Sequence, residues 1–193
     1  MKTKSPLLTK SKYLTGLQCP RLIWVQIHEP EKIPETDPVT QHIFDQGHLV
    51  GDLAKKLFPG GIDLSNENFM ANISKTKESL KNRVPLFEPG ILVNNLYSRL
   101  DILSPAGENG WDIFEVKAST SVKEVNVNDV AFQRYCCTQA GLNINKSYLI
   151  LINNKYVRDG DIDPKGLFTI NDITAEVEEA SEGIHDQIES IQD

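Results

Sequence analysis

Apolar and polar residues alternate with a helical period in the first third of the chain. Residues 11–28 show two short helical stretches broken at Cys19-Pro20, and proline suits the first turn of a helix. A longer helix is expected over residues 41–58, followed by a more polar one over residues 72–82. The longer helix is expected to bury one stripe, formed by Ile43, Gly47, Val50, Ala54 and Leu57.

The pattern becomes extended between residues 84 and 118. Strands are expected at residues 84–88, 92–97, 99–104 and 111–118. Residues 105–110 are turn-forming, so the last two strands are expected to pair as an antiparallel hairpin.

A helix and a buried strand follow this hairpin. The helix is expected over residues 128–140 and ends at Gly141, and the apolar run Tyr148 to Ile152 is typical of a strand covered on both faces. A strand, a helix and a strand in this order predict a right-handed crossover and a parallel pair. The predicted fold class is therefore α/β, a mixed β-sheet flanked by helices in the order helix, three strands, helix, strand.

The 193 residues fit one domain in three parts. Residues 1–40 form an N-terminal helical segment and linker, residues 41–171 the core, and residues 172–193 an acidic C-terminal helix. That last helix either packs on the core or binds a partner through an apolar face of Ile173, Val177, Ala180, Ile184, Ile188 and Ile191.

Composition and charge narrow the function classes. The chain is 39% hydrophobic and 24% charged, and lacks both a signal peptide and an apolar run of the ~20 residues that span a membrane. We therefore expect a cytoplasmic protein with no membrane partner, and reduced cysteines. A net charge of -7 argues against a protein that simply coats nucleic acid. Residues 1–28 hold five basic residues and no acid, which suits either a solvated tail or a contact with phosphates.

Candidate chemistry lies on the expected hairpin. In the strand 111–118 side chains alternate between faces, so Glu115 and Lys117 point to the same side. The preceding strand supplies one acid, Asp101, which the hairpin brings beside Glu115. Neighbouring carboxylates repel unless a proton or a cation lies between them, and a hard divalent ion such as Mg2+ would resolve the repulsion. The alternative is a structural ion pair on an exposed sheet face.

These residues resemble a known nuclease family. Arg99-Leu100-Asp101 followed by Phe114-Glu115-Val116-Lys117 is similar to the motif of the PD-(D/E)XK superfamily, whose restriction-endonuclease-like core has the expected element order. The stretches 13–24, 47–58 and 129–133 are similar to its RecB-like branch, which includes CRISPR-associated exonucleases.

The resemblance implies a metal-dependent deoxyribonuclease, an exonuclease that acts on DNA ends or single strands. Asp101 and Glu115 would hold Mg2+ or Mn2+, with the Val116 carbonyl and Glu88 as candidate further ligands. The metal would acidify an attacking water and offset charge on the scissile phosphate. Lys117 would orient that water or stabilise the developing charge.

The helices supply further candidate site residues. Gln133 lies on the inward face of the helix 128–140, as a glutamine does in RecB-like nucleases. The tyrosine that follows four residues later in that family is absent, and Tyr135 faces elsewhere. The family's first-helix histidine is also missing, which leaves Asp52 as a substitute third ligand and His48 as an expected solvated residue.

Cys19 resembles the first of four cysteines that hold a [4Fe-4S] cluster in several RecB-like nucleases. Four thiolates are the usual requirement, and no cysteine follows Cys137, so no cluster is expected in this chain. Cys19 is then either a buried small residue or one ligand of a longer protein. The missing histidine and cysteines leave a second hypothesis open, an inactive or incomplete nuclease-fold module that binds nucleic acid or a partner protein. The sequence leaves the oligomeric state open.

Overall fold

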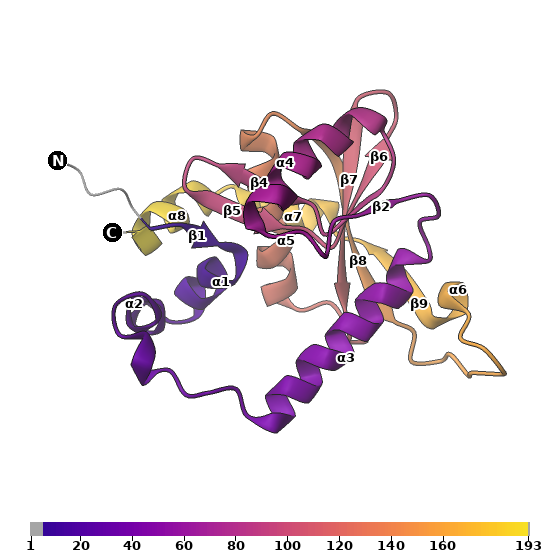
Figure 1. The fold of residues 1–193 in the computed structure, drawn as a ribbon, viewed down its shortest axis with the longest axis horizontal. Coiled ribbons are helices and arrows are strands. Elements are labelled where there is room, and N and C mark those ends of the chain that lie inside the picture. Colours follow the sequence, from indigo (N-terminus) through magenta and orange to yellow (C-terminus); the bar gives the residue numbers. More distant parts are fainter. Residues whose placement is uncertain (1–5, 193) are drawn as a thin grey trace.

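The computed structural model describes residues 6–192, which form a mixed α/β fold of two sheets flanked by helices (Figure 1). The larger sheet has the strand order β2 (Ile62–Asp63), β3 (Leu86–Phe87), β6 (Ile102–Ala106), β7 (Gly110–Lys117), β8 (Asn143–Ile152) and β9 (Phe168–Asp172). The smaller sheet has the order β1 (Leu8–Thr9), β5 (Leu96–Arg99) and β4 (Gly90–Val93). Of the basic N-terminal residues, Lys2 and Lys4 lie outside the described residues.

The helices surround these sheets. They are α1 (Lys10–Gln18), α2 (Pro20–His28), α3 (Pro38–Lys55), α4 (Phe69–Ser79), α5 (Glu124–Gln139), α6 (Pro164–Leu167), α7 (Thr174–Ser181) and α8 (Ile184–Gln192), with 3-10 turns at Pro30–Lys32 and Leu80–Asn82. No helix within residues 6–192 combines the length and the apolar character that crossing a bilayer requires.

The expected hairpin and crossover are confirmed. β6 and β7 pair antiparallel with Ile102 opposite Phe114, and β7 and β8 pair parallel with Glu115 opposite Leu149. Helix α5 connects β7 to β8 and begins four residues earlier than expected, at Glu124. The order of these elements gives the sheet a central strand, β7, that is paired on both sides.

The expected strands before the hairpin have the wrong bounds. The stretch 92–97 is the hairpin of β4 and β5, because Asn94 takes a left-handed conformation (φ 53°) that turns the chain. The stretch 99–104 also divides, since Arg99 ends β5 in the small sheet and Ile102 begins β6 in the large one. Asp101 therefore lies in the link between the two sheets.

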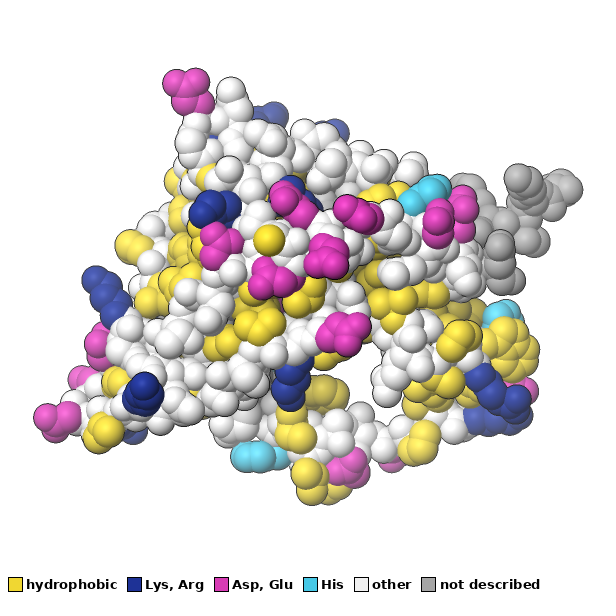
Figure 2. All heavy atoms as spheres, turned by 180° about the vertical axis from the view of Figure 1, so that it is seen from behind, with side chains coloured by type: hydrophobic (Ala, Val, Ile, Leu, Met, Phe, Trp, Pro, Cys, Tyr) yellow, Lys and Arg dark blue, Asp and Glu magenta, His cyan; other side chains and the backbone are white. Residues whose placement is uncertain are grey.

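Helix α3 exists as predicted, but its buried stripe is wrong. The side chain of Ile43 is 61% exposed, whereas Ala54 near the other end of the helix is completely buried. Only the C-terminal end of α3 reaches the sheet, and its first half stands away from the other elements (Figure 1). An opening is visible between this half, the α1–α2 segment and the rest of the molecule (Figure 2).

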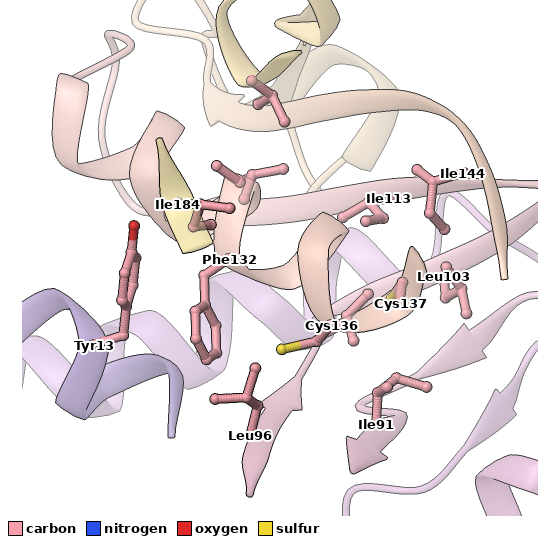
Figure 3. Packing of buried hydrophobic residues seen from close by; sticks show 14 of the residues in the cluster. Tyr13, Ile91, Leu96, Leu103, Ile113, Phe132, Cys136, Cys137, Ile144 and Ile184 are labelled. Carbon is pink, nitrogen blue, oxygen red and sulfur yellow. The ribbon is translucent and has the colours of Figure 1, made fainter. Parts of the chain in front are cut away.

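The two faces of the large sheet have different covers. Ile113 and Leu149 face the main core, to which α5, α1, α7 and α8 contribute, whereas Phe114 and Ile150 face the end of α3. Tyr13 of α1 stacks on Phe132 of α5 with ring centroids 4.7 Å apart (Figure 3). Because side chains alternate along β7, Glu115 and Lys117 lie on the α5 side of the sheet.

The C-terminal segment packs on this core, which is the first of the two expected alternatives. It forms α7 and α8 rather than one helix, and Val177, Ile184 and Ile188 are buried. Gly16 of α1 allows the close approach of α8, since a Cβ atom there would lie 2.8 Å from the Ile191 side chain. The contact with α8 thus helps to hold α1 against the core.

Candidate functional site

Glu115 lies at the centre of a buried cluster of charged side chains. It is 1% exposed, and each carboxylate oxygen accepts from two donors. Oε1 lies 2.6 Å from Lys117 Nζ and 3.0 Å from Lys10 Nζ. Oε2 lies 2.7 Å from Gln133 Nε2 and 3.2 Å from Lys10 Nζ. Both oxygens are therefore fully engaged by the chain itself.

Lys117 lies on the same face of β7 as Glu115, which confirms the predicted orientation. Its Nζ also donates to Asp129 Oδ2 at 2.8 Å. Burial alone would lower the pKa of Lys117, but the negative charges of Glu115 and Asp129 outweigh burial and hold this pKa above its ordinary value. Lys117 is thus a fixed cation over the pH range in which proteins are studied.

Helix α5 contributes two buried polar residues one turn apart, Asp129 and Gln133. Gln133 faces inward as predicted, and its Nε2 donates to Asp129 Oδ1 at 2.9 Å as well as to Glu115. Burial, with the charge of Glu115, raises the pKa of Asp129. Asp129 was not among the predicted site residues, although its spacing of four from Gln133 places both on one helix face.

Lys10 is the second site residue that was not predicted from the sequence. It is the first residue of α1 and reaches Glu115 across a separation of 105 residues. Its Nζ also lies 3.3 Å from Asp129 Oδ1. The pairing of β1 with β5 and the stacking of Tyr13 on Phe132 place α1 so that Lys10 points at the cluster. No local pattern in the sequence predicts this long-range contact.

Asp101 approaches the cluster from the link between the sheets. Its Oδ2 accepts a hydrogen bond from the Val116 amide at 2.7 Å. Burial and the negative charge of Glu115 raise the pKa of Asp101 to about 8. The pKa of Glu115 moves the opposite way, because Lys10 and Lys117 outweigh the effect of its burial. The two carboxyl groups therefore behave as a pair in which Asp101 keeps its proton at neutral pH.

Val116 occupies the edge of β7 beside Asp101. The pairing of β6 with β7 begins only at Ile102 and Phe114, so β6 leaves the Val116 position of β7 unpaired. Within a strand the N–H and C=O of one residue point to the same side. The Val116 carbonyl thus lies on the edge where its amide binds Asp101.

Glu88 lies close to this group but has a partner of its own. Its Oε2 is 3.0 Å from Arg99 Nε, and Asn72 Nδ2 donates to the Glu88 carbonyl at 2.9 Å. Burial raises the pKa of Glu88, and the charge of Glu115 adds to the effect. Glu88 therefore lies beside the cluster, and its carboxylate is paired with Arg99.

The remaining candidate site residues lie outside the cluster around Glu115. His48 and Asp52 are exposed on α3, and Asp52 pairs with Lys55 at 2.9 Å. The hydroxyl of Tyr135 makes its hydrogen bond with His185 Nδ1 at 3.1 Å. None of the three contacts Glu115 within the described part of the chain.

The three cysteines are all free thiols with different surroundings. Cys19 is partly exposed between α1 and α2, whereas Cys136 and Cys137 are buried in the core (Figure 3). Burial raises the pKa of Cys137 to about 12 and also raises that of Cys136. The thiolate is the reactive form of cysteine. Burial therefore protects these two thiols from reaction in two ways, because reagents cannot reach them and because they stay protonated.

We expect Cys19 alone to react with a thiol reagent in the native protein. Titration with Ellman's reagent should show one fast-reacting thiol, and the other two only after unfolding in guanidinium chloride. Cys19→Ser is the matched control and should remove the fast phase. Rapid reaction of more than one thiol in the folded chain would contradict this packing of α5.

The donor atoms of the cluster determine whether a divalent cation can bind there. Among residues 6–192, no three or more His, Cys, Asp or Glu side chains are grouped as a metal site, and two ammonium groups lie among the carboxylates. The oxygen donors of Asp101, Glu115 and the Val116 carbonyl are of the kind that Mg2+ and Mn2+ prefer. The buried Gln133 Oε1 has no hydrogen-bond partner among the described residues, so it is available to accept from a bound water. The donor set therefore fits such an ion once an ammonium group moves.

Comparison with known proteins gives little beyond this geometry. No protein-family model and no curated protein matches the chain. Among solved structures, a crystal structure of SSO0001 matches with a TM-score of 0.44 and 12% sequence identity, over 98% of this chain and 78% of that one. The function proposed for the chain therefore rests on its own site.

Proposed function

We propose that this chain is a metal-dependent nuclease with a restriction-endonuclease-like core of the PD-(D/E)XK type. The observation that carries the proposal is the meeting of Asp101, Glu115 and Lys117 in one buried cluster, with the pKa values of the two carboxyl groups moved in opposite directions. Carboxyl groups whose pKa values are driven apart by their surroundings are typical of catalytic sites. The antiparallel hairpin and the crossover through α5 support the proposal, since the resemblance implies a core with these elements.

Asp101 and Glu115 would hold Mg2+ or Mn2+, with the Val116 carbonyl as a further oxygen donor. The bound ion would lower the pKa of an attacking water and offset charge on the scissile phosphate. Glu88 is a weaker candidate ligand, since Arg99 already neutralises it.

The neighbouring side chains would orient these ligands and stabilise charge. Gln133 donates to Glu115 and fixes the direction of its carboxylate, as supporting residues around a metal site do. Lys117, held in its charged form, would stabilise the negative charge that develops on the phosphate in the transition state. Lys117 thus serves the reaction through its charge rather than through proton transfer.

The substrate would approach from the lysine side of the cluster. The side chains of Lys10 and Lys117 are 22% and 27% exposed, while those of Glu115 and Asp129 are 2% and 3% exposed. An anionic phosphate would therefore meet the ammonium groups first. DNA ends or single strands are the proposed substrates, on the strength of the sequence resemblance to RecB-like exonucleases.

The test is a cleavage assay with the purified chain. Labelled single-stranded and double-stranded DNA, and RNA of the same sequence, are incubated with Mg2+, with Mn2+ and with a chelator. We expect DNA cleavage with either metal and none with the chelator. Cleavage that persists in the chelator, or no cleavage of any substrate with either metal, would refute the proposal.

A second candidate function is a nuclease-fold module that binds nucleic acid or a protein without cleaving. The observation that favours it is the complete engagement of Glu115 by Lys10, Lys117 and Gln133. If these contacts are permanent, the cluster is a structural ion-pair network. Retention of labelled DNA in a filter-binding assay, without metal-dependent cleavage, would support this alternative.

A further inference from the structure

The Glu115 carboxylate has no free acceptor position for a metal ion. A carboxylate offers about four lone-pair sites on its two oxygens. Oε1 accepts from Lys117 and Lys10, and Oε2 accepts from Gln133 and Lys10. A divalent cation can bind Glu115 only if one of these donors leaves.

Gln133 and Lys117 are poorly suited to leave. Gln133 is completely buried, and its Nε2 is also held by Asp129 at 2.9 Å. Lys117 shares the strand with Glu115 and is held by the other Asp129 oxygen at 2.8 Å. Moving either side chain would break two contacts of 2.6 to 2.9 Å, whereas the contacts of Lys10 with Glu115 and Asp129 are longer, at 3.0 to 3.3 Å.

Lys10 is suited to leave. It is the donor that contacts both Glu115 oxygens, so its departure opens one position on each of them. Its side chain is 22% exposed and has a long flexible stem, so a rotation about its own side-chain bonds carries the ammonium group into water. The backbone of α1 can remain in place, anchored by Tyr13 on Phe132.

The charges of the cluster support the same exchange. Lys10 and Lys117 face three carboxyl groups, those of Asp101, Glu115 and Asp129. A divalent cation bound to Glu115 would lie beside both ammonium groups and repel them, and the departure of the Lys10 ammonium removes one of these repulsions.

We propose that Lys10 is a built-in cation that competes with a divalent metal ion for the Glu115 carboxylate, and so sets how tightly the site binds the metal. The inference rests on the proposed metal site at Asp101 and Glu115. It makes Lys10 a residue that determines metal affinity, acting through Glu115.

The test is calorimetric titration of the full chain with Mn2+ at fixed pH and ionic strength. We expect Lys10→Met to bind Mn2+ at least about tenfold more tightly than the wild type, since a competing charge within contact distance shifts such equilibria by about one to three decades. Lys12→Met removes the same charge from the same helix, where Lys12 Nζ contacts only the Leu7 carbonyl among described partners, at 3.5 Å. This control should match the wild type to within about twofold.

Lys10→Arg extends the test in the opposite direction. A guanidinium group pairs bidentately with a carboxylate and keeps the ion pair, so this variant should fold and bind Mn2+ about threefold or more weakly. The measurement thus remains decisive if Lys10→Met fails to fold. Equal or weaker binding by Lys10→Met, or unchanged binding by Lys10→Arg, would overturn the role of Lys10.

Glu115→Gln separates this inference from the proposed function. If the wild type binds Mn2+ and cleaves DNA but the Lys10 variants bind as the wild type does, only the competition fails. If Lys10→Met binds more tightly, Glu115→Gln loses binding and no variant cleaves, the competition stands and the nuclease proposal fails. If no variant binds Mn2+, both are overturned.

Discussion

Glu115→Gln and Asp101→Asn are each expected to abolish metal-dependent DNA cleavage by the proposed nuclease. Both changes keep the shape of the side chain and remove one of the two carboxylates that would hold the ion. Glutamine is preferred to alanine at position 115, because its side-chain oxygen can still accept a hydrogen bond from Lys10 or Lys117. Removing that side chain altogether would leave buried ammonium groups with too few partners, at a cost of about 3–5 kcal/mol.

Lys117→Met is expected to behave differently from these two variants. The metal ligands remain and Lys117 no longer competes for Glu115 Oε1, so Mn2+ should bind at least as tightly as in the wild type when measured by calorimetry. Turnover should fall by about a hundredfold or more, which corresponds to about 3 kcal/mol of transition-state stabilisation. Full activity in Lys117→Met or Glu115→Gln would rule out the proposed site.

An exposed lysine provides the matched control for charge. Lys146 on β8 pairs with Asp172 at 2.8 Å, and its side chain is 48% exposed. Lys146→Met removes the same charge outside the cluster and should leave turnover unchanged. Equal losses in Lys146→Met and Lys117→Met would indicate that general electrostatic attraction of DNA, rather than the cluster, produces the effect.

The parts of the site that the sequence predicts are those carried by local spacing. Glu115 and Lys117 share a face because strand side chains alternate, and the turn at residues 105–110 fixes β6 beside β7. Gln133 faces the cluster because the helical period of α5 puts it inward. Each of these inferences depends on residues close together in the sequence.

Lys10 could not be predicted in this way. Its contact with Glu115 depends on β1 joining the small sheet, on Tyr13 packing against Phe132 and on α8 covering α1. These contacts join segments from the two ends of the chain. The N-terminal part, expected as a helical segment and linker over residues 1–40, contributes a charged residue to the candidate site.

Helix α3 shows a different limit of pattern analysis. The spacing of Ile43, Val50 and Ala54 correctly predicts a helix with an apolar face. Periodicity says nothing about what covers that face, and the covering elements reach only the end that contains Ala54. The strand predicted at residues 92–97 was wrong for a different reason, since the left-handed residue Asn94 turns this stretch into the β4–β5 hairpin.

Asp101 is expected to destabilise the metal-free protein progressively as pH rises. Its folded-state pKa is raised to about 8 from the ordinary value of 3.8, so the folded chain holds a proton that the unfolded chain releases. Since the folded state binds more protons between these two values, the free energy of unfolding falls as pH increases from about 4 to about 8. Above the folded-state pKa the Asp101 carboxyl group is ionised in both states. Its destabilising contribution is then complete and no longer changes with pH.

Asp101→Asn tests this expectation directly. Asparagine is neutral at every pH and can still accept the hydrogen bond from the Val116 amide through its side-chain oxygen. In the presence of a chelator at pH 8, the variant should therefore be more stable than the wild type by about 1 kcal/mol or more, a rise in melting temperature of about 2–4 °C per kcal/mol. Near pH 4 the difference should be much smaller, because the wild-type carboxyl group is then neutral in the folded state and about half protonated in the unfolded state.

Divalent metal should reverse the order of the two proteins. With excess Mn2+ at pH 8, the wild type gains stability through binding, whereas Asp101→Asn has lost a ligand and gains less. Melting curves of both proteins at several pH values, with chelator and with Mn2+, measure both effects in one series. An Asp101→Asn variant that is less stable than the wild type at pH 8 in chelator would show that the Asp101 carboxyl group is a stabilising anion there, and would remove the repelling carboxylate pair on which the proposed metal site depends.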